Sequence, residues 1–109
     1  SFVNKDDIEK YFLSSKLVIL PYKSASQSGI LSLAYNFNRP VIVTDVGGLS
    51  DYVSDERSGF IVPPNPKDIS DKINVFFNRG LFNSMSDFIK GYKDRFSWKL
   101  FEERLNLYE

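Results

Sequence analysis

The chain has 109 residues, 42% of them hydrophobic and 26% charged, with fourteen basic residues balanced by fourteen acidic ones. This length and composition predict one folded domain rather than a disordered segment, and the zero net charge argues against a nucleic-acid surface. Cys and His do not occur, which excludes disulfides, thiolate metal sites and imidazole acid-base chemistry from these residues.

The first forty residues predict two helices and one strand. Asn4 is expected to cap a helix over residues 4–13, whose apolar residues recur at helical spacing. The continuous apolar run at residues 17–20 predicts a buried strand with both faces covered. After a polar loop, a second helix is expected to begin at residue 28 or 29 and to end near residue 37, before Pro40.

The last third of the chain predicts further helices. Asn65 and the proline after it are typical of a helix start, and this helix is expected over residues 66–80. Residues 81–93 have helical spacing but a more ambiguous pattern, and Ser97 is expected to cap a separate last helix. The side chains expected to point inward from the first of these helices are Ile69, Ile73, Phe76 and Phe77.

Two more buried strands are expected at residues 41–43 and 60–62. Strands that alternate with helices predict an α/β fold, with a Rossmann-like parallel sheet and helices on both faces. Ligands of such sheets bind beyond the carboxyl ends of the strands. Any site is therefore expected in the loops at residues 21–28 and 44–49.

Small hydroxylated residues lead into the second predicted helix, and the free N–H groups of such a helix start attract anions. Gly29 would let a ligand approach the backbone. Ser26 and Ser28 offer hydroxyl donors, and Lys23 adds a positive charge. A phosphate is the ligand that this pattern favours, although a serine at this place also serves as an ordinary helix cap.

The second loop contains Gly47 and Gly48 between two acidic residues, Asp45 and Asp51. A glycine pair can admit a sugar or phosphate past bare backbone, but more often it forms a turn. The two carboxylates can be read as an acid-base couple, yet aspartates in such loops are mostly turn formers or helix caps.

Four segments in a fixed order carry a resemblance to a known family. They read LVILP at 17–21, SQSG at 26–29, PVIVTDVGG at 40–48 and SGFIVPP at 58–64. From about residue 12 to the end, the chain resembles the C-terminal, nucleotide-sugar-binding domain of GT-B glycosyltransferases of family 4, the group-1 type. The resemblance implies that residues 1–109 are part of that domain, with the N-terminal acceptor domain absent.

In that family the donor lies between two Rossmann-like domains, and no metal or other cofactor is needed. The resemblance assigns contacts with the donor phosphates to Ser28, Gly29 and Ile30 and assigns no catalytic residue. It also implies transfer with retained anomeric configuration, with the positive helix end stabilising the departing nucleoside diphosphate. The residues implied to form the donor cleft are Lys23, Ser26, Gln27, Gly47 and Gly48.

The chain departs from the family in one feature, its usual pair of Glu residues eight positions apart. With Pro40 as the anchor, the matching positions hold Ala25 and Leu33. A shift of one residue, to Ser26 and Ala34, does not restore the pair. We therefore expect either a divergent branch that keeps the phosphate site or a branch that has lost activity.

The leading hypothesis is a part of a glycosyltransferase that binds a nucleoside diphosphate sugar. The hexose would pass to a carbohydrate or lipid-linked acceptor, held by the absent domain, in polysaccharide or glycolipid synthesis. The fragment alone is expected to be inactive and to self-associate through an uncovered sheet edge.

The alternative is a non-catalytic interaction or regulatory domain, which a core position of Leu33 would favour. A nicotinamide-type dinucleotide fold is disfavoured because no G-x-G-x-x-G follows a strand. The longest apolar run is too short to span a membrane, and the first residues do not resemble a secretion signal. We expect a cytoplasmic protein, with a peripheral position at the inner membrane face as a further expectation.

Overall fold

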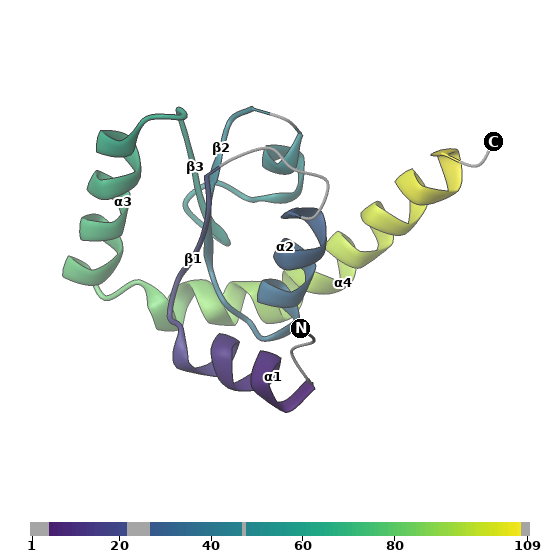
Figure 1. The fold of residues 1–109 in the computed structure, drawn as a ribbon, viewed down its shortest axis with the longest axis horizontal. Helices are drawn as coiled ribbons and strands as arrows, with labels where there is room; N and C mark the ends of the chain where they lie inside the picture. The colour runs from purple at the N-terminus through teal and green to yellow at the C-terminus, as the bar shows by residue number, and fades with distance from the viewer. Residues whose placement is uncertain (1–4, 22–26, 47, 108–109) are drawn as a thin grey trace.

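The centre of the fold is a parallel sheet of three strands in the order β1-β2-β3 (Figure 1). The computed structural model of this chain describes residues 5–21, 27–46 and 48–107. Because all pairs are parallel, the three strands end at one common edge of the sheet, the upper edge in Figure 1. The predicted α/β fold is confirmed. The strands are β1 (Val18–Leu20), β2 (Val41–Thr44) and β3 (Gly59–Val62).

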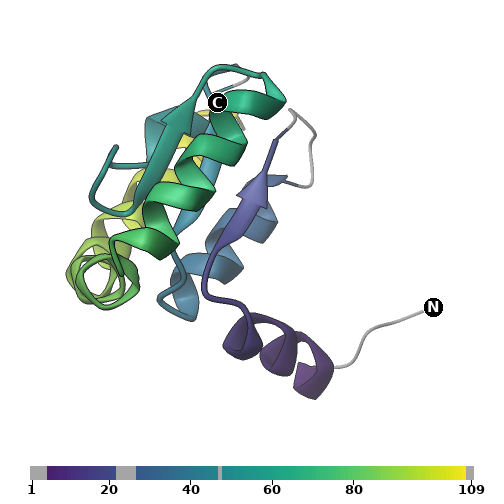
Figure 2. The same cartoon turned by 90° about the vertical axis from the view of Figure 1, so that its left-hand side faces the viewer.

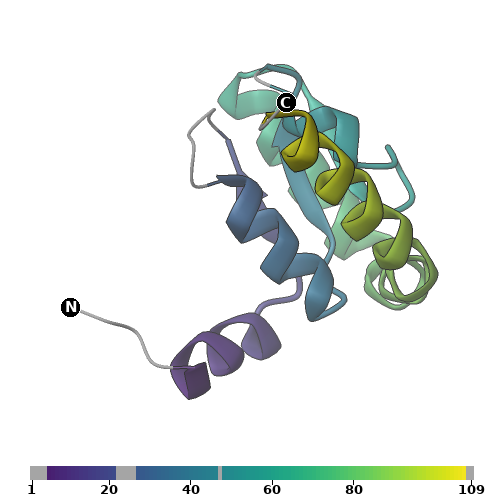
Figure 3. The same cartoon turned by 90° about the vertical axis from the view of Figure 1, so that its right-hand side faces the viewer.

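Helices cover the two faces of the sheet. α2 and the middle of α4 pack on one face, and α3 and the start of α4 pack on the other (Figures 1 and 3). The long α4 reaches both faces because it crosses beneath the sheet, opposite the edge at which the strands end. The helices are α1 (Lys5–Ser14), α2 (Gln27–Asn36), the short 3₁₀-helix η1 (Leu49–Tyr52), α3 (Pro66–Asn78) and α4 (Phe82–Leu107).

The pleat of the sheet divides its side chains between two apolar clusters. Val41 and Val43 belong to the cluster under α2, together with Leu31 of that helix. Ile42, which points to the opposite face, belongs to the second cluster with Phe76 of α3. All residues of β2 are buried, as expected of a central strand in a parallel sheet.

The prediction that both faces of β1 are covered is wrong. Val18 and Leu20 are buried, but Ile19 between them is 38% exposed. Figure 2 shows the cause, because β1 lies beside α3 rather than behind it. An apolar run predicts a strand, but it carries no information on how far the covering helices extend.

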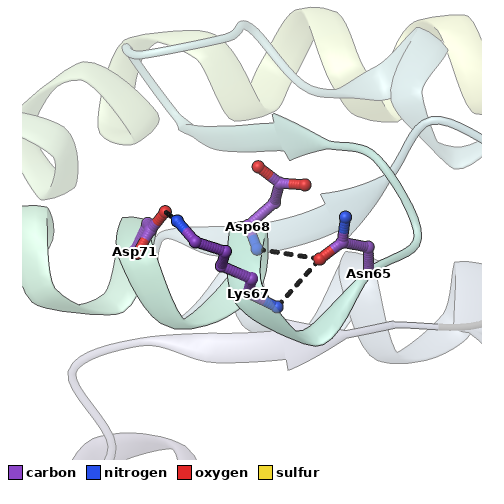
Figure 4. Close-up of polar contacts among 4 residues, drawn as sticks. All are labelled: Asn65, Lys67, Asp68 and Asp71. Carbon is purple, nitrogen blue, oxygen red and sulfur yellow. Dashed lines mark hydrogen bonds and ion pairs between the residues drawn. The ribbon is translucent and has the colours of Figure 1, made fainter.

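The start of α3 follows the prediction closely (Figure 4). The side chain of Asn65 accepts hydrogen bonds from the backbone N–H groups of Lys67 and Asp68, at 2.9 and 3.3 Å. Proline is then tolerated in the first turn because its missing N–H would have no partner there. The inward position predicted for Phe77 is wrong, since this ring is 55% exposed and meets the buried Phe76 edge-to-face.

The predicted break before Ser97 is also wrong. α4 continues through this residue to Leu107, so Ser97 lies inside a helix and does not cap one. No proline interrupts the segment, and Gly91 adopts the helical conformation. A serine acts as a cap only where a helix begins, and in the interior of a helix it costs little stability.

The first residue of β3, Gly59, has to be a glycine because β2 passes too close to it for a side chain. A Cβ atom placed on Gly59 would lie 2.0 Å from the carbonyl oxygen of Val41. The two strands are paired at this same position. The glycine of the SGFIVPP segment therefore has a packing role.

Candidate functional site

Two helices begin at the carboxyl edge of the sheet, one on each face. α2 begins at Gln27 after β1, and α3 begins at Pro66 after β3 (Figure 1). The first N–H groups of a helix have no partners within it and carry partial positive charge. In α3 two of these groups are bonded to Asn65. The start of α2, which follows β1, is the candidate anion site at this edge.

The three residues predicted to contact phosphate lie in the first turn of α2. Ser28 is half-buried, whereas Gly29 and Ile30 are exposed. A Cβ atom added to Gly29 would meet nothing within 4 Å, so a ligand can approach the backbone here. The predicted cleft residues that lie outside the described residues are Lys23, Ser26 and Gly47.

Gln27, also predicted to form the cleft, is almost fully buried at the first position of α2, with 8% of its surface exposed. Its side-chain Oε1 is buried and has no hydrogen-bond partner within the described residues. The residue type and its place in the sequence did not predict this burial, because glutamine is usually exposed at a helix start.

The ends of the three strands are held together by hydrogen bonds that the sequence did not predict. The buried Thr44 donates from its hydroxyl group to the carbonyl oxygen of Pro21, over 3.1 Å. The backbone N–H of Asp45 donates to the carbonyl oxygen of Val62, over 2.9 Å. These bonds fix the points at which the chain leaves β1 and β2 toward the two loops of the candidate site.

Gly48 has a conformational role in the second loop. Its φ of 91° is in the left-handed region, which glycine adopts without strain, and its carbonyl oxygen accepts from the N–H of Asp51. This geometry agrees with the turn interpretation for Gly48. Asp45 is exposed, and Asp51 lies in the first turn of η1.

Leu33, whose burial in the core would favour the non-catalytic alternative, is 37% exposed and not in the core. It borders an open depression of about 550 Å³ between α1 and the end of α2. The first turn of α2 contributes no residue to the lining of this depression. The other residues that line it are Ile8, Glu9, Asn36 and Phe37.

A buried pair of hydroxyl groups supports the face of the sheet under α2. Tyr35 Oη and Ser58 Oγ are 2.7 Å apart, and Ser58 Oγ also accepts from the backbone N–H of Ser54. Burial raises the pKa of the Tyr35 hydroxyl well above its ordinary value, and the bond with Ser58 offsets part of this rise. Tyr35 therefore stays protonated at neutral pH and acts here as a structural residue.

Comparison with known proteins gives one family. Residues 1–79 match the model described as glycosyl transferases group 1. The chain is similar to an uncharacterized glycosyltransferase of Methanocaldococcus jannaschii, with 28% identity over 99% of this chain and 29% of the relative. It is also similar to a D-inositol 3-phosphate glycosyltransferase of Paenarthrobacter aurescens, with 32% identity over 66% of this chain and 18% of the relative.

A second uncharacterized glycosyltransferase of Methanocaldococcus jannaschii is 26% identical over 86% of this chain and 27% of the relative. The chain thus spans less than a third of the length of these relatives. Within the described residues, no helix has both the length and the apolar character that a membrane span requires.

Proposed function

Because this chain belongs to the family of glycosyl transferases group 1, we propose that it holds the sugar donor of a longer enzyme. The donor is a nucleoside diphosphate sugar, and its hexose passes to a carbohydrate or lipid-linked acceptor with retained anomeric configuration. The acceptor is held by a further domain, and the product belongs to polysaccharide or glycolipid synthesis. Residues 1–109 then form part of the C-terminal, donor-binding domain.

The observation that supports this proposal most is the position of the start of α2. The helix begins at the carboxyl edge of a parallel sheet, where ligands of such folds bind. In this proposal the backbone N–H groups of Ser28, Gly29 and Ile30 bind the diphosphate, and the open space beside Gly29 supports close approach of the ligand. The same partial positive charge stabilises the nucleoside diphosphate as it departs.

The remaining parts of the proposal concern the surroundings of this helix start. The cleft is formed with Lys23, Ser26, Gln27, Gly47 and Gly48, and neither a metal ion nor another cofactor is assigned to it. The longer enzyme acts in the cytoplasm, with a peripheral position at the inner membrane face. Alone, the chain is expected to be inactive and to self-associate through the outer edge of β1, which is an edge strand. A single monomeric species in sedimentation at high concentration would contradict self-association.

The test of donor binding is an NMR titration of the chain with UDP, GDP, UDP-glucose and GDP-mannose. We expect chemical-shift changes at the amides of Ser28, Gly29 and Ile30. The amides of Lys67 and Asp68 are an internal control, because they occupy the same place in α3 but already donate to Asn65. Equal changes at both helix starts would indicate unspecific anion binding, and no change in α2 would refute the proposal.

A second candidate is a non-catalytic α/β domain that binds another macromolecule. The residue type of Leu33 supports it, since this apolar residue stands where the family usually has Glu. The 37% exposure of Leu33 beside an open depression does not, because a core position was the expectation under this alternative. The titration separates the two functions. An interaction domain would leave the amides of α2 unchanged with all four nucleotides.

A further inference from the structure

The side chain of Gln27 carries a buried polar atom, Oε1, without a hydrogen-bond partner within the described residues. It is the first residue of α2, it is 8% exposed, and its Oε1 has no hydrogen-bond partner within the described residues. Among the side chains that the structure describes, those of residues 6–21, 27–46 and 48–95, no other buried oxygen or nitrogen is in this state. The atom therefore calls for a physical explanation.

An unpaired buried amide oxygen destabilises the folded chain. The group loses its hydrogen bonds with water and gains none in exchange. An apolar side chain of similar size at position 27 would avoid this loss. Buried polar groups in native proteins nearly always have partners, so a partner supplied by a ligand is a consistent reason for retaining this one.

The geometry of a helix directs this side chain to the candidate site. Helical side chains tilt toward the amino end of their helix, so the side chain of the first residue extends past that end. For Gln27 this direction is toward the carboxyl edge of the sheet. Oε1 is therefore expected near the first turn of α2, whose N–H groups have no partners within the helix itself.

We propose that Oε1 of Gln27 accepts a hydrogen bond from a hydroxyl group of the bound nucleoside diphosphate sugar, while the first turn of α2 holds the diphosphate. This inference rests on the proposed function. A carbonyl oxygen repels phosphate oxygens, so it faces a hydrogen-bond donor of the ligand and not the diphosphate itself; the two groups next to the diphosphate, the ribose and the hexose, offer hydroxyl donors. Gln27 is thus a binding residue that recognises the ribose or the hexose.

The test compares the wild-type chain with Gln27→Met, which keeps a side chain of similar length but loses the amide. Calorimetry would measure the Kd of UDP, GDP, UDP-glucose and GDP-mannose, and thermal unfolding would measure stability without ligand. We expect the melting temperature to rise and the Kd of the bound nucleotide sugar to increase roughly tenfold. A purely structural role predicts instead that melting temperature and affinity fall together, which would overturn the proposal.

The nucleotides without sugar identify the hydroxyl group. An equal loss with UDP and UDP-glucose assigns it to the ribose, and a loss confined to UDP-glucose assigns it to the hexose; both results support the proposal. In the wild-type chain, the side-chain NH₂ resonances of Gln27 should also shift on binding, a readout that does not depend on the variant folding. Unchanged Kd values in Gln27→Met would overturn this inference alone. A wild-type chain that binds no nucleotide would overturn the proposed function as well.

Discussion

Replacing Gly29 by Ala should stabilise the chain and weaken nucleotide binding at the same time. Gly29 is in the first turn of α2, and an added Cβ atom meets nothing within 4 Å. Glycine inside a helix costs about 0.5 to 1 kcal/mol relative to alanine, so the melting temperature should rise by about 2 to 8 °C. If the backbone of Gly29 contacts phosphate, the same Cβ atom occupies the approach of the ligand. Loss of one hydrogen bond to a charged group, about 1.5 to 3 kcal/mol, raises Kd roughly 10- to 150-fold.

Gly91→Ala is the matched control for this experiment. Gly91 is also helical and a Cβ atom there also meets nothing within 4 Å, but it lies in α4. We expect a similar stabilisation with an unchanged Kd. Thermal unfolding and calorimetric titration with UDP and GDP measure both quantities for both variants. Equal Kd values for Gly29→Ala and the wild type would refute the reasoning, because the helix start would then not contact the diphosphate.

Gly59→Ala should lower the free energy of unfolding in urea by more than about 2 kcal/mol, since its Cβ atom would lie 2.0 Å from the carbonyl oxygen of Val41. Asn65→Ala should cost about 1 kcal/mol in the same assay, through loss of the cap of α3, without a change in nucleotide affinity. Tyr35→Phe should cost about 1 kcal/mol at neutral pH, through loss of the hydrogen bond with Ser58. Burial raises the pKa of the Tyr35 hydroxyl in the folded chain, so the unfolded chain loses the hydroxyl proton at a lower pH than the folded one. The free energy of unfolding should therefore fall as the pH rises above about 10. Tyr35→Phe should reduce that fall in an alkaline titration.

The parts of the fold that followed from the sequence are those set by neighbours along the chain. Val41 to Val43 are β-branched and apolar, and the strand they predict is the central one. Asn65 and Pro66 predict a helix start because the cap and the first turn involve adjacent residues only. Ile19 and Phe77 were misjudged because their exposure depends on which distant helices cover them.

The site was partly predictable for the same reason. A strand, a short loop and a helix in succession place the helix start at the carboxyl edge, which fixed the place of Ser28 to Ile30. The bonds that hold this edge join residues far apart in the chain. Thr44 and Pro21 are 23 positions apart, and no local pattern distinguishes this threonine from one in an ordinary turn.

The phosphate and the sugar of a donor depend on different groups of the protein. The phosphate binding proposed at the start of α2 would use backbone N–H groups, which any sequence that folds into the helix retains. Recognition of hydroxyl groups needs side-chain acceptors, and Leu33 is apolar where the family usually has a carboxylate. Under the proposed function, such a chain keeps its affinity for nucleoside diphosphates, while its selectivity among sugars depends on the acceptors that remain. The acceptor proposed above is Oε1 of Gln27, which is buried and has no partner within the described residues. The ratio of Kd values for UDP and UDP-glucose measures that separation directly, since a ratio near one means that the hexose contributes no net affinity.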